Sequence, residues 1–105
     1  MPNIPDELVK ALLDDLKCGH LSAVISVSDD LLKTYPSSIM VLNIKGVALT
    51  NTKDYDLAEC CFNTAIKKSP MIDYTHCNLG NLNFNKGNFD LAKQNYKDSL
   101  RLNPK

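Results

Sequence analysis

The chain has 105 residues, with 12 basic and 12 acidic side chains and a formal net charge of zero. A chain of this length folds as one domain with a modest core, and its neutral balance argues against binding to nucleic acid or to an anionic membrane. The first residues are acidic and broken by proline, unlike a signal peptide, and no long uncharged apolar segment is present. The sequence therefore predicts a soluble, cytoplasmic domain that spans no membrane.

Hydrophobic periodicity and helix-ending residues predict six helices in chain order. Their expected ranges are 6–18, 21–34, 38–51, 55–68, 72–86 and 89–102. The connections between them are only two to four residues long, so consecutive helices must run antiparallel. The expected fold is all-α, with three antiparallel helix pairs.

One apolar stripe runs along the fourth helix and returns in the sixth. It comprises Tyr55, Ala58, Phe62, Ala65 and Ile66 in the fourth helix and Phe89, Ala92, Tyr96 and Leu100 in the sixth. A proline follows each even-numbered helix and stops it, at Pro36, Pro70 and Pro104. Asp54 and Asn88 precede the fourth and sixth helices, where they suit the N-cap. The second and third helix pairs are thus variants of one unit.

The sequence repeats itself with a period of 34 residues. The superposed pairs include Gly46 with Gly80, Asn51 with Asn85, Tyr55 with Phe89, Asp56-Leu57-Ala58 with Asp90-Leu91-Ala92, and Phe62 with Tyr96. Shifting backwards finds a weaker third copy, in which Leu12, Val24 and Ser28 replace the glycine, the alanine and the aromatic residue. Glycine inside a helix costs stability unless a neighbouring helix needs the room. Gly46 and Gly80 therefore predict close helix packing.

This pattern resembles the tetratricopeptide repeat family, whose signature is W-x2-L-G-x2-Y, then A-x3-F, then P. The third copy reads His76-x2-Leu79-Gly80-x2-Asn83, Ala92-x3-Tyr96 and Pro104, and the second reads Leu42-x2-Lys45-Gly46-x2-Leu49, Ala58-x3-Phe62 and Pro70. The resemblance implies a single domain over residues 1–105, with repeats at 5–38, 39–72 and 73–105, coiled into a right-handed superhelical solenoid. In the first copy the helix pair is expected but its close packing is not.

Four cysteines occur, at Cys18, Cys60, Cys61 and Cys77, without the C-x-x-C spacing of zinc or thioredoxin sites. Adjacent residues on a helix point about 100° apart, so Cys60 and Cys61 are poorly placed to bind one ion together. The matching positions of the third copy hold Gln94 and Asn95. We therefore expect free thiols that serve mostly as small apolar side chains.

No catalytic or cofactor-binding pattern is present. His20 lies in the first turn between helices and His76 near the start of the fifth helix, where a packed histidine is the expected role. The paired acids Asp14–Asp15 and Asp29–Asp30 lack converging ligands for a metal. The sequence predicts that the chain is not an enzyme and that it holds no metal or cofactor.

What remains is a surface, because the resemblance implies that the first helix of each pair lines a concave, binding side. The residues expected there are Lys10, Met40, Asn43, Ile44, Val47, Thr50, Tyr74, Asn78, Asn81, Phe84 and Asn85. Asparagine can bond both the C=O and the N–H of a peptide, so an extended peptide or partner domain is the expected ligand. The alternative that these asparagines only solvate a helix face stays open. The family's two-carboxylate clamp is not expected, since its basic partners are absent.

Two further hypotheses stay open. LNIKGVAL and HCNLGN are similar to repeats that precede O-linked N-acetylglucosamine transferase-type and sulfotransferase domains, and Asn78 matches the asparagine ladder of the former group. The chain would then be the substrate-recruiting segment of a larger enzyme. Alternatively, the last repeat lacks a following capping helix before Lys105, and its open stacking face would let copies of the chain self-associate as a scaffold.

Overall fold

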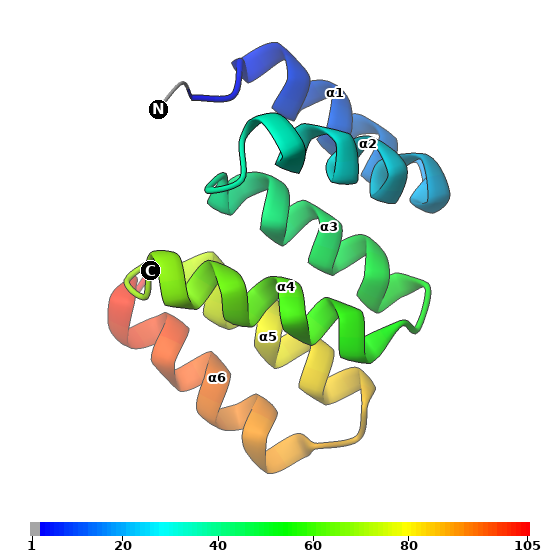
Figure 1. Ribbon diagram of the computed structural model, residues 1–105. Coiled ribbons are helices and arrows are strands. Elements are labelled where there is room, and N and C mark those ends of the chain that lie inside the picture. Colours follow the sequence, from blue (N-terminus) through cyan, green and yellow to red (C-terminus); the bar gives the residue numbers. More distant parts are fainter. Residues whose placement is uncertain (1–2) are drawn as a thin grey trace.

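The computed structural model describes residues 3–105, and all regular secondary structure in this range is helical. The helices are α1 (Asp6–Lys17), α2 (Leu21–Thr34), α3 (Ile39–Asn51), α4 (Tyr55–Lys68), α5 (Asp73–Asn85) and α6 (Phe89–Leu102), shown in Figure 1. Every predicted helix is found, with its ends displaced by no more than one residue. The prediction of an all-α fold of stacked helix pairs is confirmed.

The six helices stack in chain order, and each packs against the next (Figure 1). In addition, α1 contacts α3, and α3 contacts α5. Over residues 3–105, by contrast, the even-numbered helices make no contacts with one another. The odd-numbered helices are therefore closer together, and they form the inner layer of the stack.

The core consists of two clusters that join successive helix pairs. Leu12, Val24, Ile44 and Ala48 form the first, and Leu49, Ala58, Cys61, Phe62 and Leu82 form the second. Both clusters include residues of α3, so this helix is covered on two sides. The hydrophobic stabilisation of the chain therefore depends on contacts between pairs as well as within them.

Two glycines let aromatic rings lie against the backbone of the odd-numbered helices. A Cβ atom built on Gly46 would lie 2.6 Å from Cζ of Phe62, and one built on Gly80 would lie 2.7 Å from Cε1 of Tyr96. Both distances are far below van der Waals contact, so no larger residue fits without movement of the ring. The close packing predicted from these glycines is confirmed.

In the first helix pair, the sizes of the residues at these two registers are exchanged. Leu12 stands at the register of Gly46, and Ser28 stands at the register of Phe62. Both side chains are buried, at 3% and 0% exposure, and the Ser28 hydroxyl has no hydrogen-bond partner among residues 3–105. The large residue is thus on α1 and the small one on α2. These two helices pack less extensively against each other than α3 does against α4 or α5 against α6, as the sequence predicts for the first copy.

Three turns that link the two helices of a pair use the left-handed backbone region. The residues concerned are Gly19, Lys53 and Gly87, with φ of 81°, 67° and 85°, and they are spaced by the 34-residue period. Glycine adopts this conformation without strain, whereas the Cβ of Lys53 crowds the backbone. The second turn is therefore the strained one.

We expect Lys53→Gly to stabilise the chain by about 0.5–1 kcal/mol, because relief of this strain exceeds the added flexibility of the unfolded chain. Urea denaturation followed by circular dichroism measures the change. Lys67→Gly, at an exposed position inside α4, is the matched control and should cost about 1 kcal/mol. Equal destabilisation by both changes would contradict the prediction.

The predicted caps are only partly found. Asp54 and Asn88 occupy the N-cap positions of α4 and α6, but neither side chain bonds the first turn of its helix. Asp54 instead accepts a hydrogen bond from the Thr52 hydroxyl at 2.6 Å. A side-chain cap is found on α3, where Ser38 Oγ accepts from the backbone N–H of Val41 at 3.3 Å.

Candidate functional site

The residues predicted to line the concave side lie at three depths. Lys10, Met40, Asn81, Phe84 and Asn85 are exposed; Val47, Tyr74 and Asn78 are half-buried; Asn43, Ile44 and Thr50 are buried. The last three are therefore not accessible to a ligand, contrary to the sequence prediction. The accessible set is concentrated on α5.

Two of the buried residues point into the helix stack. Ile44 belongs to the core cluster that contains Leu12 and Val24. The hydroxyl of Thr50 donates to the carbonyl of Gly46 in the preceding turn, at 2.8 Å. Both positions are covered because α3 lies between two neighbouring helix pairs. The periodicity of one helix in the sequence does not reveal how many neighbours the helix has.

The third buried residue, Asn43, is held in a polar network between α3 and α5. Its Nδ2 donates to Thr75 Oγ1 at 2.8 Å and to the Ile39 carbonyl at 2.9 Å. Its Oδ1 accepts from Nδ2 of Asn78 at 2.9 Å. The side chain of Asn43 therefore bonds only within the chain, and Asn78 retains its carbonyl oxygen for another donor.

Asn78 has no asparagine counterpart in the other helix pairs. The 34-residue period places Ile44 and Lys10 at its register. A ladder of asparagines along the concave side needs the same side chain in successive repeats. The predicted likeness to the peptide-gripping ladder is thus restricted to a single residue, which also has a structural role.

Asn81 and Asn85 are the most accessible carboxamides of α5. Oδ1 of Asn81 accepts a hydrogen bond from the Tyr96 hydroxyl at 2.6 Å, which fixes the side chain and leaves its NH2 group to donate outward. Burial raises the pKa of the Tyr96 phenol, so this group stays a donor at neutral pH. The structure gives Asn85 no side-chain partner within residues 3–105.

Phe84 is exposed but belongs to a different surface from the carboxamides. Its ring meets that of Phe89 edge to face, with the centroids 5.3 Å apart. The two rings and α6 enclose an apolar hollow of about 540 Å³ at the end of the stack. We call this surface the C-terminal face; it is lined by Phe84, Phe89, Ala92, Lys93, Tyr96, Lys97 and Leu100.

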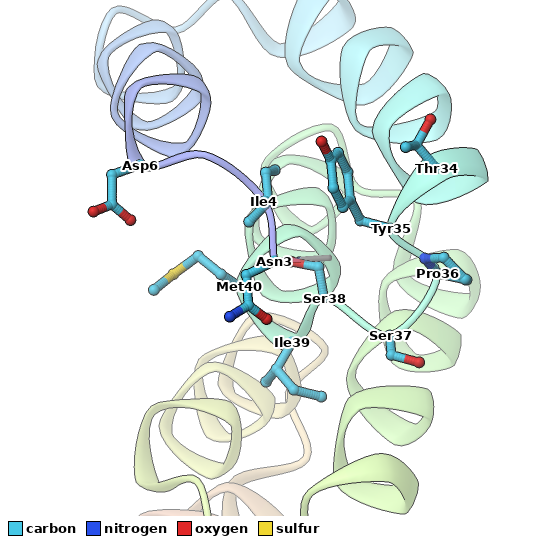
Figure 2. A pocket seen from close by; sticks show the side chains of 10 residues that line it. All are labelled: Asn3, Ile4, Asp6, Thr34, Tyr35, Pro36, Ser37, Ser38, Ile39 and Met40. Atoms are coloured by element: carbon cyan, nitrogen blue, oxygen red, sulfur yellow. The ribbon is translucent and has the colours of Figure 1, made fainter. Parts of the chain in front are cut away.

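A second cavity, of about 420 Å³, lies where α1 and α3 begin (Figure 2). The N-terminal segment and the turn between α2 and α3 form its walls; the lining residues are Asn3, Ile4, Asp6, Thr34, Tyr35, Pro36, Ser37, Ser38, Ile39 and Met40. Met40 is thus shared by this cavity and the predicted concave set. The cavity combines apolar side chains with hydroxyl groups and contains one acid, Asp6.

The histidines do not form a reactive cluster. His76 is half-buried, and its Nε2 lies 2.9 Å from the carbonyl oxygen of Pro70. His20 belongs to the first helix pair, where its Nδ1 lies 3.3 Å from Oδ1 of Asp15. In the part of the chain that the structure describes, no three His, Cys, Asp or Glu side chains converge as metal ligands. None of the helices in that part is both long and apolar enough to cross a membrane.

Comparison with known families identifies the unit that the stack repeats. The family model described as tetratricopeptide repeat matches residues 74–105, which comprise nearly all of α5 and α6. The two preceding pairs repeat this arrangement. Residues 74–105 are therefore a tetratricopeptide repeat. No curated protein matches the chain.

This tetratricopeptide repeat is the third helix pair, which carries Gly80, Ala92 and Tyr96 of the signature. Tetratricopeptide repeats mediate contacts between proteins, and the family is typically a non-catalytic helical fold. In general terms, the match therefore supports an interaction module. It does not specify the surface that is used or the ligand.

The four thiols are free and differ in accessibility. Cys18 and Cys60 are exposed, Cys77 is half-buried, and Cys61 is buried in the core beside Phe62. Burial raises the pKa of the Cys61 thiol, although the nearby Lys45 opposes the shift. The expected packing role therefore holds for Cys61 and not for Cys18 or Cys60.

We expect a thiol-specific alkylating reagent to modify Cys18 and Cys60 quickly at neutral pH and Cys61 only when the chain opens. Mass spectrometry of peptides from timed samples measures the four rates. Denaturant should bring Cys61 to the rate of Cys60, its direct neighbour and internal control. Rapid modification of Cys61 in the folded chain would contradict the structure.

Proposed function

We propose that this chain is a non-catalytic module that binds an extended peptide on the concave side formed by α1, α3 and α5. The observation that carries the proposal is a single accessible stripe on α5. Tyr74, Asn78, Asn81 and Asn85 follow one another at i, i+4, i+7 and i+11, and each is exposed or half-buried. This spacing places all four on one side of the helix.

The carboxamides of the stripe suit a peptide backbone. Asn78 offers a carbonyl oxygen and Asn81 an NH2 group, as their remaining partners are fixed within the chain. Asn78 and Asn85 are separated by about 10 Å along the helix axis at 1.5 Å per residue, which is about the length of three extended residues. A peptide running along α5 can therefore bond this stripe at successive backbone groups.

The charge of the proposed site is low. Lys10 is its one charged member, and it lies on α1, away from the carboxamide stripe. Binding through neutral hydrogen bonds and apolar contacts depends little on ionic strength, since there is almost no charge to screen. This favours an uncharged peptide segment over a strongly acidic or basic one.

The experiment is a selection of short random peptides displayed on phage, with the immobilised chain as the target. An enriched peptide is then titrated into labelled protein and followed by nuclear magnetic resonance. We expect amide shifts at Val47, Tyr74 and Asn81. The double variant Asn81→Ala/Asn85→Ala should weaken binding about tenfold, since each lost hydrogen bond is worth roughly 0.5–1.5 kcal/mol.

The controls separate binding from folding. Asn63→Ala, an exposed carboxamide of the outer helix α4, is the matched control and should leave the affinity unchanged. Asn78 is not replaced, because it supports the buried Asn43. Failure to enrich any peptide, or shifts confined to the even-numbered helices or the C-terminal face, would overturn the proposal.

A recruiting segment for a transferase domain is less well supported. That hypothesis depends on the asparagine ladder, and the equivalents of Asn78 are Ile44 and Lys10. Ile44 is also buried in the core. The concave-side proposal requires no ladder and no further domain.

A further inference from the structure

The C-terminal face is an apolar surface that the stack leaves open. Phe84, Phe89 and Leu100 expose 57%, 60% and 56% of their surfaces around the hollow. Exposed apolar surface of this kind marks an interaction site when it is contiguous. The repeat indicates what kind of element could cover the C-terminal face, because the equivalent surface of an earlier repeat is covered by the next helix of the chain.

The covered copy of the C-terminal face lies on α4. The 34-residue period places Tyr96 on Phe62 and Ala92 on Ala58, and both of these α4 residues are completely buried. The element that covers them is α5, which inserts Leu82 into the cluster of Phe62 and Ala58. By this internal comparison, the C-terminal face fits an α-helix that lies across it as α5 lies across α4.

Charges distinguish the C-terminal face from its covered copies. Inside the stack, Asp29 of α2 pairs with Lys45 of α3 at 2.6 Å, and Glu59 of α4 pairs with Lys86 of α5 at 3.4 Å. The acid is on the even-numbered helix both times, and the lysine is on the helix that follows. The hydrogen bond that Lys45 donates to Asp29 raises the pKa of Lys45, as a favourable ion pair does.

On α6 the signs are reversed. The period places Lys97 at the register of Asp29 and Lys93 at the register of Glu59, and both lysines are exposed on the C-terminal face. A covering helix like α3 or α5 would bring its own lysine toward one of them. A helix with acids at the registers of Lys45 and Lys86 would instead pair with both lysines of α6, with the signs of the two ion pairs exchanged.

A second copy of the chain does not meet this requirement. Continuing the stack would place α1 of that copy on the C-terminal face, with Asp14 at the register of Leu82. Burial of that carboxylate among aromatic rings is costly without a partner. The registers that should hold acids carry Ala11 and Cys18. Stacking of copies is therefore disfavoured on both counts.

We propose that the C-terminal face binds a helix of a different polypeptide that has an acidic residue at i, leucine at i+3 and an acidic residue at i+7. The leucine fills the hollow between Phe84 and Tyr96 in the manner of Leu82. The acid at i pairs with Lys97 and the acid at i+7 with Lys93. This site adjoins the concave side, because the Tyr96 that lines it donates a hydrogen bond to Asn81. It does not depend on the peptide proposed to bind there.

The probe is a synthetic alanine-rich helical peptide of about 20 residues, long enough to be helical alone. It carries leucine at i−4, i−1 and i+3 and glutamate at i and i+7; a matched peptide has lysine in place of both glutamates. Nuclear magnetic resonance titration of the labelled chain measures both affinities. We expect the glutamate peptide to bind about tenfold more tightly, given roughly 0.2–1 kcal/mol for each exposed ion pair.

Charge exchange on the protein provides the decisive comparison. The double variant Lys93→Glu/Lys97→Glu should reverse the preference between the peptides, and both changes are at exposed positions that leave the core intact. Leu100→Asp should abolish binding of either peptide. Asn63→Lys, a change of charge on the exposed side of α4, is the control and should change neither affinity.

Four outcomes would overturn the proposal. The first is the absence of binding by the glutamate peptide, and the second is a preference that does not reverse with the lysine replacements. The third is a concentration-dependent dimer, measured by light scattering, that Leu100→Asp dissolves, because a second copy would then be the occupant. Shifts on α5 carboxamides alone would assign the peptide to the concave side instead.

Discussion

Replacement of Phe62 by alanine is expected to destabilise the chain by about 3–5 kcal/mol, the cost of a large cavity in a packed core. The ring is fully buried and packs against Gly46 of α3, Ala58 of its own helix and Leu82 of α5. It therefore joins two helix pairs. Urea denaturation followed by circular dichroism gives the free energy of unfolding.

The same ring determines what Gly46 tolerates. In the natural chain, Gly46→Ala should cost about 1–3 kcal/mol, because the new methyl group collides with Phe62 and the strain exceeds the better helix propensity of alanine. With Phe62→Ala already present, the same change should stabilise the chain by up to about 1 kcal/mol. The sign reversal is the expected result. An equal cost of Gly46→Ala in both backgrounds would show that the ring is not the cause.

The size exchange in the first pair predicts a second large coupling. Leu12→Gly should cost about 3–5 kcal/mol, combining loss of a buried leucine with the helix penalty of glycine. Ser28→Phe alone should cost about 1–3 kcal/mol through overpacking against Leu12. The double variant restores the residue types of Gly46 and Phe62, so it should lose less stability than the two single changes together.

The measurement is a double-mutant cycle from urea denaturation of the four proteins. A favourable coupling of about 1–3 kcal/mol is expected for side chains that share one space. Val27→Ala, on an exposed face of α2, combined with Leu12→Gly is the control pair and should be additive. Additivity of Leu12→Gly with Ser28→Phe would mean that the two side chains fill separate spaces.

The helices could be predicted from the sequence because local signals agree with one another. Helix ends are marked by proline at Pro36, Pro70 and Pro104 and by glycine at Gly19 and Gly87. The apolar stripes then identify the helices between these ends. The left-handed backbone at Lys53 was not predicted, although the 34-residue register with the two glycines contains the signal. Local chemistry is strong at helix ends, where the backbone itself is constrained.

The site was harder to predict than the fold. Tyr74, Asn81 and Asn85 are accessible as expected, but Asn43 and Ile44 are buried because α3 is covered by neighbours on more than one side. The sequence of α3, IMVLNIKGVALTN, has apolar residues all round the helix, which is the pattern of a buried helix. A register alone identifies one face, and it does not say how many neighbours a helix has.

The unequal number of neighbours also sets where the chain can open. α3 contacts every other helix except α6, whereas α6 contacts α5 alone. Detachment of α6 breaks one helix–helix interface, while release of α3 breaks four. The interface between α5 and α6 is nevertheless the most extensive in the stack, whereas α1 packs much less extensively against α2 and α3. Local opening therefore begins at the first helix, and the central one opens only when the whole domain unfolds. The C-terminal face thus lies at the more firmly packed end of the chain, where a ligand meets a surface that is already in place.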